Sequence, residues 1–410
     1  MENEKRNFIA FNWHAFWLAL AQTFADKNTV LPGLILLSGG TQFELGLLTS
    51  IMIGIPLVSQ LLFASYLTQK PLKKYFLLFG IYLRVLAFAG VALTLYSIDF
   101  ADPMFIIYSV FGWMFIFSVS GAFAGVSYTD ILGKSISPNT RKRFFVTRQF
   151  LNSVGILISA IIVRSLLKTI NYPENYIYMF TIASVLLFVA ALGFLRLKER
   201  PSEILNKGKK WSEVLKSIPS IIKKDSNLKN LVISVNLLSV SFTMIPFYMS
   251  LVKSRGDLSQ SIIGNFLLVQ IIGMVLSNLL WMKYTKQHGF KGMFKMAAML
   301  YSALPIVALI FAYTIPIEFF WIVFFMIGAS MSAYKISSES ILIEISDESN
   351  RPLYTGIYGT LNLTMALFPL IIGILIATVG FTAVFVFASM LTFSALFFLN
   401  RMICPADKGK

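Results

Sequence analysis

The sequence predicts an all-α polytopic membrane protein of about twelve transmembrane helices in two pseudo-symmetric six-helix bundles, from its composition, its apolar runs and a match between its halves. Of 410 residues, 57% are hydrophobic and only 13% are charged, which is more apolar surface than a soluble protein of this size buries. The apolar runs are about 20 residues long, the length that a helix needs to cross a hydrocarbon core. A soluble domain is therefore excluded.

The twelve spans are expected at roughly 10–37, 44–66, 75–97, 103–127, 144–167, 176–197, 228–252, 261–284, 293–314, 317–342, 354–378 and 381–402. The loops between them differ in charge. Most lysines and arginines lie before the first span, after the even-numbered spans and in the central stretch 196–229, whereas the opposite loops hold only Lys168, Lys253 and Arg255. The positive-inside rule then places both termini in the cytoplasm of a multi-pass cell-membrane protein. The net charge of +16 thus sets orientation and does not indicate a nucleic-acid partner.

The predicted domains are an N-terminal six-helix bundle at 1–197, a cytoplasmic linker at 198–227 and a C-terminal six-helix bundle at 228–410. The linker contains Trp-Ser-Glu-Val-Leu-Lys-Ser-Ile-Pro-Ser-Ile-Ile-Lys-Lys, whose apolar spacing is that of an amphipathic helix. Because basic amphipathic segments usually rest on anionic lipid, we favour an interfacial helix over a binding site.

An internal repeat relates the two halves. At one constant spacing, the first-half residues Gly46, Ser59, Gln60, Leu61, Leu62, Tyr66 and Gln69 align with Gly264, Ser277, Asn278, Leu279, Leu280, Tyr284 and Gln287. In a second match, Asn139–Arg141 aligns with Ser349–Arg351, and Asn152 falls on Asn362 at the same offset. A duplicated six-span unit predicts a binding site between the bundles, near the membrane midplane.

The loop after the second predicted span resembles a loop of the major facilitator superfamily, whose pattern is Gly-x-Leu-Ala-Asp-Arg-x-Gly-Arg-Lys. In Ser65–Lys74, Leu67 and the basic positions Lys70, Lys73 and Lys74 match, whereas both glycines and the aspartate are replaced. The topology extends the resemblance over essentially the whole chain. It implies a secondary active transporter that carries a small solute by alternating access, as a monomer and without a cofactor.

The first span also resembles one branch of that superfamily. The stretch Asp26–Pro32 is similar to the Asp-x-Thr-Ile-Val-Asn-Val-Ala-Leu-Pro segment of proton-coupled drug antiporters. Their Gly-Pro-rich motif in span five is missing, because Gln149–Leu167 contains no proline and only Gly155. Drug efflux by proton antiport is therefore an alternative, as is a transport-inactive receptor or scaffold with the same fold.

Asp26 is the first candidate for chemistry, because an ionisable side chain within a span costs about 2.5–3.5 kcal/mol on insertion scales. On a continuous helix, Gln22 would lie one turn earlier on the same face. A carboxyl in this place is suited to bind and release a proton during transport. Alternatively, Asp26 pairs with a neighbouring cation or caps a helix break before Pro32.

Polar residues in other predicted spans complete the candidate substrate and proton pathway. The full set is Gln22, Asp26, Asn28, Asn236, Gln270, Tyr334, Lys335, Tyr358 and Asn362. The alternative for each of them is a hydrogen bond that only joins helices, and for Lys335 we favour an ion pair with Glu339, four residues on. We expect Arg84 to stabilise the first bundle in preference to binding an anionic substrate. The pair Gly121 and Gly125 predicts close helix packing.

A second set of charged residues forms a candidate cytoplasmic gate. Its members are Lys70, Lys73, Lys74, Asp130, Arg141, Glu339 and Arg351. The alternative is a set of solvated loop charges, since exposed ion pairs contribute little.

Enzymatic and metal-dependent functions lack the residues they need. Ile131–Ser135 imitates the end of a phosphate-binding loop, but Tyr128 stands where that loop requires glycine. The two histidines, His14 and His288, lie in different halves, and the single cysteine, Cys404, is near the C-terminus. We expect no enzyme activity, cofactor or metal, and we expect a small-molecule substrate, protons as a candidate coupling ion and the lipid bilayer as partners.

Overall fold

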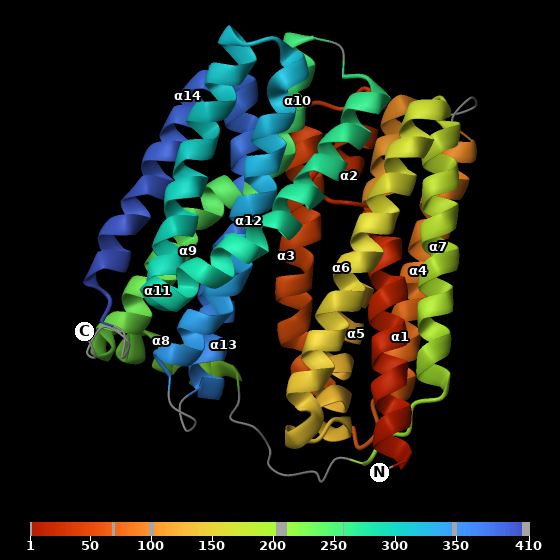
Figure 1. The fold of residues 1–410 in the computed structure, drawn as a ribbon, viewed down its shortest axis with the longest axis vertical. Coiled ribbons are helices and arrows are strands. Elements are labelled where there is room, and N and C mark those ends of the chain that lie inside the picture. The colour runs from red at the N-terminus through yellow and green to blue at the C-terminus, as the bar shows by residue number, and fades with distance from the viewer. Residues whose placement is uncertain are drawn as a thin grey trace. The chain divides into compact units, whose positions relative to one another are not determined.

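The computed structural model describes residues 2–67, 70–97, 102–201, 211–256, 258–346 and 351–403, and these ranges form helices and short connections without a β-strand (Figure 1). The chain divides into two compact units. Unit 1 comprises Met1–Glu44, Ile51–Lys207 and Ser259–Leu268, and unit 2 comprises Leu45–Ser50, Gly208–Leu258 and Val269–Lys410. The change from unit 1 to unit 2 after Lys207 falls inside the predicted linker, whose exact bounds remain a prediction.

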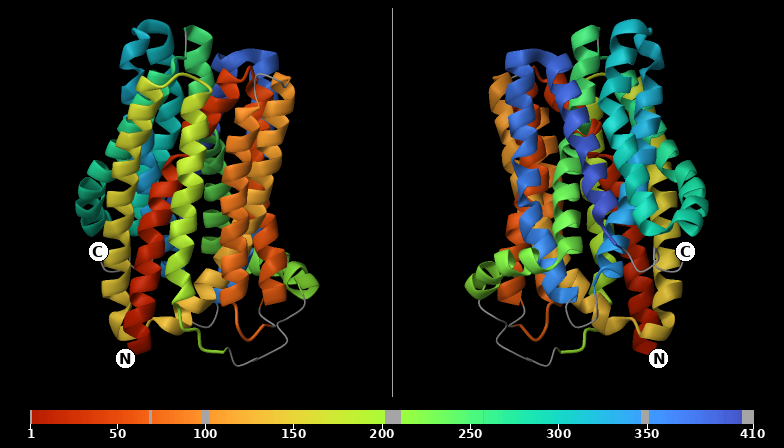
Figure 2. Two further views of the ribbon diagram at one scale, coloured as in Figure 1. Left: turned by 90° about the vertical axis from the view of Figure 1, so that its right-hand side faces the viewer. Right: turned by 90° about the vertical axis from the view of Figure 1, so that its left-hand side faces the viewer.

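The first half of the chain contains seven labelled helices before the linker. They are α1 (Glu2–Thr23), α2 (Val30–Leu37), α3 (Gln42–Leu67), α4 (Lys74–Tyr96), α5 (Pro103–Ser135), α6 (Pro138–Thr169) and α7 (Glu174–Leu195). Helix α4 packs against α5 and α7, and α1 packs against α6 and α7. Figure 2 shows α1 and α7 side by side along much of their length.

The second half begins with the predicted amphipathic helix, which is observed as α8 (Trp211–Lys224). The remaining elements are α9 (Ser226–Thr243), α10 (Ile245–Arg255), α11 (Gln260–Thr314), η2 (Ile317–Phe320), α12 (Trp321–Glu344), α13 (Arg351–Leu361), η3 (Asn362–Ala366) and α14 (Phe368–Arg401). Helices α9 and α14 pack against each other in unit 2.

Nine helical segments of the described residues are long and apolar enough to cross a membrane. Two of these segments are each interrupted by a glycine with positive φ, Gly289 at 67° in α11 and Gly380 at 84° in α14. Glycine suits both positions because a Cβ disfavours this backbone conformation. Dividing α11 and α14 there gives eleven segments, and the interrupted pair α1–α2 supplies the twelfth, as predicted.

Each unit includes a short segment from the other half of the sequence, and a repeat-related glycine lies in each. In unit 1, a Cβ on Gly264 would stand 2.9 Å from the Arg164 Cα, and the Arg164 Nε donates a 2.6 Å hydrogen bond to the Asn265 Oδ1. In unit 2, a Cβ on Gly46 would stand 2.6 Å from the Pro369 carbonyl oxygen. The sequence match between these glycines therefore reflects backbones that approach too closely for a side chain.

Candidate functional site

A cavity of about 180 Å³ lies inside unit 1, among α1, α4, α5 and α6. Its polar and charged lining consists of His14, Arg84, Tyr128, Arg148 and Asn152. Its other lining residues are Ala15, Leu18, Leu77, Ile81, Gly121, Ala124 and Gly125. The described lining therefore contains two guanidinium groups and no carboxylate.

Close packing of α4 on α5 positions Arg84. A Cβ on Gly80 would stand only 2.9 Å from the Ser120 carbonyl oxygen and 3.0 Å from the Ala124 Cβ. Only a glycine permits this approach, and Arg84 follows one turn later on the same face of α4. The Arg84 side chain accordingly lies against Gly121, where a Cβ would be 3.5 Å from the Arg84 Nε.

Arg84 is a buried cation without a carboxylate partner among the described residues. Its relative exposure is 8%, and its Nε has no hydrogen-bond partner there. The guanidinium carbon lies 4.2 Å from the centroid of the Phe117 ring, which itself stacks on Phe88. A cation–π contact offsets only part of the cost of removing a guanidinium from water. An anion in the cavity would supply the missing charge and acceptors.

The second guanidinium, of Arg148, enters the cavity from α6. Its central carbon lies 5.4 Å from the centroid of the Tyr128 ring. On the α1 side, the His14 Nδ1 lies 3.2 Å from the Ala190 carbonyl oxygen and donates to it, which orients the imidazole. Asn152 also lines the cavity, so guanidinium, imidazole, phenol and amide groups are available to a small polar ligand.

Gly121 and Gly125 border this cavity, and the expectation that they form a helix-packing contact is wrong. Nothing lies within 4 Å of a Cβ built on Gly125, and the neighbour of Gly121 is the Arg84 side chain. The close contact between α4 and α5 is made instead by Gly80 and by Gly90, whose Cβ would overlap the Trp113 indole. The small side chains on α5 leave the space that Arg84 enters.

Asp26 lies in the interruption of the first span, where its Oδ1 accepts three hydrogen bonds. The donors are the Asn28 amide at 3.0 Å, the Thr29 amide at 2.9 Å and the Thr29 hydroxyl at 2.8 Å. The carboxylate thus satisfies two backbone amides in the turn between α1 and α2. The continuous helix assumed for Gln22 and Asp26 is wrong, because α1 ends at Thr23, and Gln22 is exposed.

In unit 2, two predicted pathway residues meet directly. The Asn236 Nδ2 donates to the Asn362 Oδ1 and to the Leu361 carbonyl oxygen, both at 3.2 Å. Asn362 is buried, and it begins the short η3 segment between α13 and α14. This contact joins helices, which was the alternative interpretation for these side chains.

The other unit 2 candidates lie in an aromatic interior. Tyr334 shares a side-chain hydrogen bond with Tyr358 and stacks on Phe242, with 5.5 Å between the ring centroids. Gln270 is buried, and among the described residues its Oε1 has no hydrogen-bond partner. Lys335 is exposed, and the side chain of Glu339, its expected partner, lies outside the described part of the structure.

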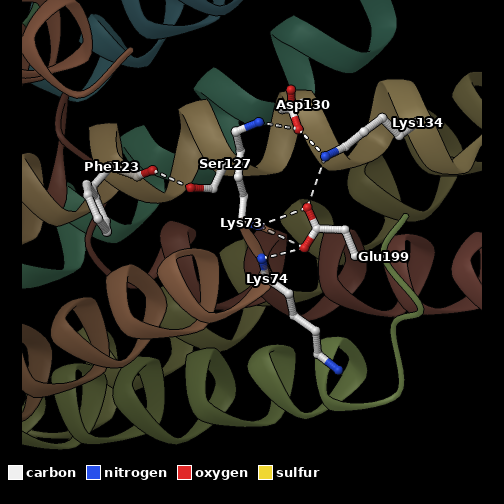
Figure 3. Close-up of polar contacts among 7 residues, drawn as sticks. All are labelled: Lys73, Lys74, Phe123, Ser127, Asp130, Lys134 and Glu199. Carbon is white, nitrogen blue, oxygen red and sulfur yellow. Dashed lines mark hydrogen bonds and ion pairs between the residues drawn. The ribbon is translucent and has the colours of Figure 1, made fainter. Parts of the chain in front are cut away.

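Three of the predicted gate residues meet at one end of unit 1 (Figure 3). Asp130 pairs with Lys73 at 2.8 Å and with Lys134 at 2.5 Å, and Lys134 also pairs with Glu199 at 3.0 Å. The Glu199 carboxylate accepts from the backbone amides of Lys73 and Lys74, at the start of α4. The cluster therefore ties together α4, α5 and the chain that follows α7.

Glu199 was absent from the sequence-based candidates because it lies in the stretch from Arg196 to Lys229, where basic residues outnumber acidic ones. The remaining gate candidates make local contacts or fall outside the description. The Lys70 ammonium lies 4.9 Å from the centroid of the Tyr66 ring, and Arg141 donates to the Ile136 carbonyl oxygen. The side chain of Arg351 is not among the described side chains.

No group of three or more histidine, cysteine, aspartate or glutamate side chains that could hold a metal ion occurs in the described ranges. The described ranges instead form a polytopic helical protein with polar and charged groups buried between membrane-length helices. Such groups mark solute or ion pathways in membrane proteins. The class is therefore that of membrane transport proteins.

The chain belongs to the Major Facilitator Superfamily, because the model of that family matches residues 8–258 and 231–408. This result confirms the resemblance that the sequence indicated, and with it solute transport in general as the function of the fold. No curated protein sequence matches the chain.

Solved structures share the fold at low sequence identity. A POT family transporter in complex with 5-aminolevulinic acid has a TM-score of 0.73 at 12% identity, over 97% of this chain and 96% of that one. The nucleoside transporter NupG has a TM-score of 0.64 at 14% identity, over 98% and 99%. A peptide transporter POT in complex with sulfate has a TM-score of 0.73 at 12% identity, over 96% and 94%. These neighbours confirm the twelve-helix transporter fold.

Proposed function

We propose that this protein is a secondary active transporter of a small solute that carries an anionic group, and that Arg84 and Arg148 bind this group. The observation that carries the proposal is the buried Arg84 guanidinium, which borders a cavity and has no carboxylate beside it among the described residues. An uncompensated buried charge lowers the stability of the fold by roughly several kcal/mol, and a bound anion would offset this cost.

The chemistry of the lining favours a carboxylate or phosphate group. Guanidinium offers planar paired donors that match both oxyanions, and Arg148 adds a second positive charge. Tyr128 and Asn152 add neutral hydrogen-bonding groups that can orient the solute. A volume of about 180 Å³ accommodates a small anionic group and a few further atoms. The structural neighbours carry chemically different solutes, so the fold itself does not select this class.

The test is a solute screen with purified protein in proteoliposomes. Pools of labelled carboxylates, phosphate monoesters, neutral solutes and cations are offered to the wild type, and uptake is measured with and without an imposed proton gradient. We expect uptake from an anionic pool and its loss in Arg84→Gln. Thermal unfolding in detergent, with and without the same pool, reports binding separately from transport.

Arg255→Gln is the matched control. Arg255 ends α10, its Nε already donates to the Ala312 carbonyl oxygen, and its guanidinium lies over the Tyr313 ring. If a neutral or cationic pool is taken up and this uptake survives Arg84→Gln, the proposal of an anionic solute would be wrong, and the proposal of transport would still hold. Binding without flux, from every pool, would favour the receptor or scaffold alternative.

Proton coupling through Asp26 remains a separate prediction, because the carboxylate is engaged in holding the turn that precedes α2. Asp26→Asn keeps an oxygen that can accept from the Asn28 and Thr29 amides but removes the titratable group. Asp26→Ala removes both. Loss of proton-driven uptake in Asp26→Asn, with an unchanged unfolding temperature, would support coupling and with it the antiporter alternative. Unchanged proton dependence would leave Asp26 with the structural role alone.

We further propose that the protein resides in the cell membrane with both termini in the cytoplasm, where the basic loops would lie. The ion-pair cluster of Lys73, Asp130, Lys134 and Glu199 would then stand at the cytoplasmic end of unit 1. Its support for a gating role is that it joins α4, α5 and the chain that follows α7 through few charges. Slower or faster uptake in Asp130→Asn, with solute affinity unchanged, would distinguish a gate from a solute-binding group.

A further inference from the structure

A second cavity of unit 1 has a lining that suits a lipid. It has a volume of about 600 Å³ and is lined by residues of α1 and of the C-terminal end of α7. Figure 2 shows that these two helices run side by side. The walls of the cavity are apolar and its lining includes two cations. The apolar residues are Ile9, Ala10, Trp13, Leu192 and Gly193, and the cations are Arg6 and Arg196. We call it the α1–α7 groove.

Trp13 shapes this groove and is held in place. Its indole Nε1 donates a 2.8 Å hydrogen bond to the Val189 carbonyl oxygen. A Cβ on Gly193 would stand 2.6 Å from the Trp13 Cδ1 and 3.2 Å from the Ala10 carbonyl oxygen. The missing side chain at position 193 therefore lets the indole lie on α7. The indole still exposes 42% of its area and Ile9 exposes 58%, so the groove presents a fixed apolar wall.

The two arginines differ from the rest of the lining in charge and are both exposed. None of the ion pairs among the described residues involves these two arginines. Those pairs join Asp130 to Lys73 and Lys134, and Glu199 to Lys134. Arginine binds phosphate oxygens through paired donors, and tryptophan is enriched at the level of lipid headgroups. A hydrocarbon wall with phosphate-binding groups at one end matches an amphiphile with an anionic head.

We propose that the α1–α7 groove binds an anionic phospholipid, with an acyl chain along Trp13 and Leu192 and the phosphate at Arg6 and Arg196. The apolar wall favours a lipid over free phosphate, which would leave this surface unused. Basic pockets beside transmembrane helices bind anionic headgroups, and each basic side chain contributes about a fivefold gain in affinity. This inference is independent of the transported solute.

The experiment uses the full chain, delipidated in detergent, with phosphatidylglycerol or phosphatidylcholine added back and the bound lipid counted by native mass spectrometry. We expect the wild type to retain phosphatidylglycerol in preference to phosphatidylcholine. Arg6→Gln with Arg196→Gln should weaken phosphatidylglycerol binding by about thirtyfold. Inorganic phosphate and glycerol phosphate, added in excess, should not displace the lipid.

The matched control is Lys5→Gln with Arg200→Gln, which removes two exposed charges from the same end of unit 1 but outside the groove lining. This variant should retain the preference. Equal loss in both double variants would mean general attraction of the basic surface and would overturn the site. Equal binding of both lipids, or displacement by inorganic phosphate, would overturn it as well. Thermal unfolding of each variant without lipid checks that the fold is intact.

Discussion

The two halves of this chain share a repeat but differ in what they bury. Unit 1 buries Arg84 beside a cavity that Arg148 also lines. The interior of unit 2 around Tyr334 is aromatic and uncharged among the described side chains, with Tyr301 and Phe242 as neighbours. The repeat-related amides show the same contrast. Asn152 lines the charged cavity, whereas Asn362 is buried and bonded to Asn236. The two halves thus share repeat-related positions, whereas the side chains in their interiors differ in charge.

This difference teaches that the internal repeat predicts backbone contacts better than it predicts a site. Gly46 and Gly264 align in sequence, and both permit a close backbone approach in the structure. The charge at Arg84 has no such counterpart in the matches between the halves. We therefore expect solute charge to be recognised in unit 1, and the predictions below test this asymmetry from the largest effect to the smallest.

The largest effect is expected from Arg84. Arg84→Gln should lower solute affinity by about a hundredfold or more, because the variant loses a charge-assisted contact in a buried site. Arg84→Lys should retain part of the affinity, since lysine keeps the charge without the paired donors. Uptake in proteoliposomes over a range of solute concentrations gives the measurement. If Tyr334→Phe in unit 2 caused an equal loss, the proposed asymmetry would be wrong.

An intermediate effect is expected from filling the cavity. Gly125→Leu adds a side chain where nothing lies within 4 Å of a Cβ, so the fold should tolerate it and helix propensity should improve. Solute affinity should fall by about tenfold as a hydrophobic group displaces polar contacts. Gly359→Leu is the control in unit 2, where a Cβ also meets nothing within 4 Å. Binding that survives in Gly125→Leu but not in Gly359→Leu would move the site to unit 2.

The repeat-related asparagines should separate binding from stability. Asn362→Ala should destabilise the fold by about 1 kcal/mol, because the Asn236 amide loses one of its three acceptors and keeps the Val232 and Leu361 carbonyl oxygens. Asn152→Ala should leave the unfolding temperature nearly unchanged and weaken solute binding by about fivefold, the value of one modest hydrogen bond. Thermal unfolding and solute titration on the same samples measure both quantities. An exchange of the two outcomes would contradict the assignment of the cavity.

The smallest effect is expected from the tyrosine hydroxyls of unit 2. The hydroxyls of Tyr248 and Tyr301 are buried and lack hydrogen-bond partners among the described residues. Removing an unpaired buried hydroxyl costs little and can stabilise by about 1 kcal/mol. Tyr248→Phe and Tyr301→Phe should therefore keep solute affinity and retain or raise the unfolding temperature. A fall in solute affinity would show that these hydroxyls bind the solute.

The fold was predictable because its main determinants, the apolar spans and the residues that interrupt them, are short stretches of sequence. Apolar length predicts the spans, and Gly289 and Gly380 separate helices where the predicted spans also divide. The interruption at Asp26 was only one of several interpretations, because a single carboxylate before Pro32 also fits a continuous span. The three hydrogen bonds that settle it depend on backbone geometry.

The candidate site was less predictable, because it depends on contacts between distant segments. The sequence favours a structural role for Arg84, because the third span is usually peripheral in this superfamily, and no sequence pattern links Arg84 to Arg148 or to Gly121. The position of the Arg84 side chain depends on the close packing of α4 on α5 at Gly80, and this contact is visible only in the folded structure. Distance along the sequence also concealed Glu199, whose partners Lys73 and Lys134 are at least 65 positions away.

The interrupted first span also bears on how the chain enters the membrane during synthesis. Helix α1 carries Asn7, Asn12 and His14 and is not among the nine described segments that are apolar enough to span on their own. A weak first segment is a poor signal for the insertion machinery, so we expect α3 and α4 to commit the nascent chain to the bilayer. Helix α1 would then be drawn in later, as it packs against α6 and α7.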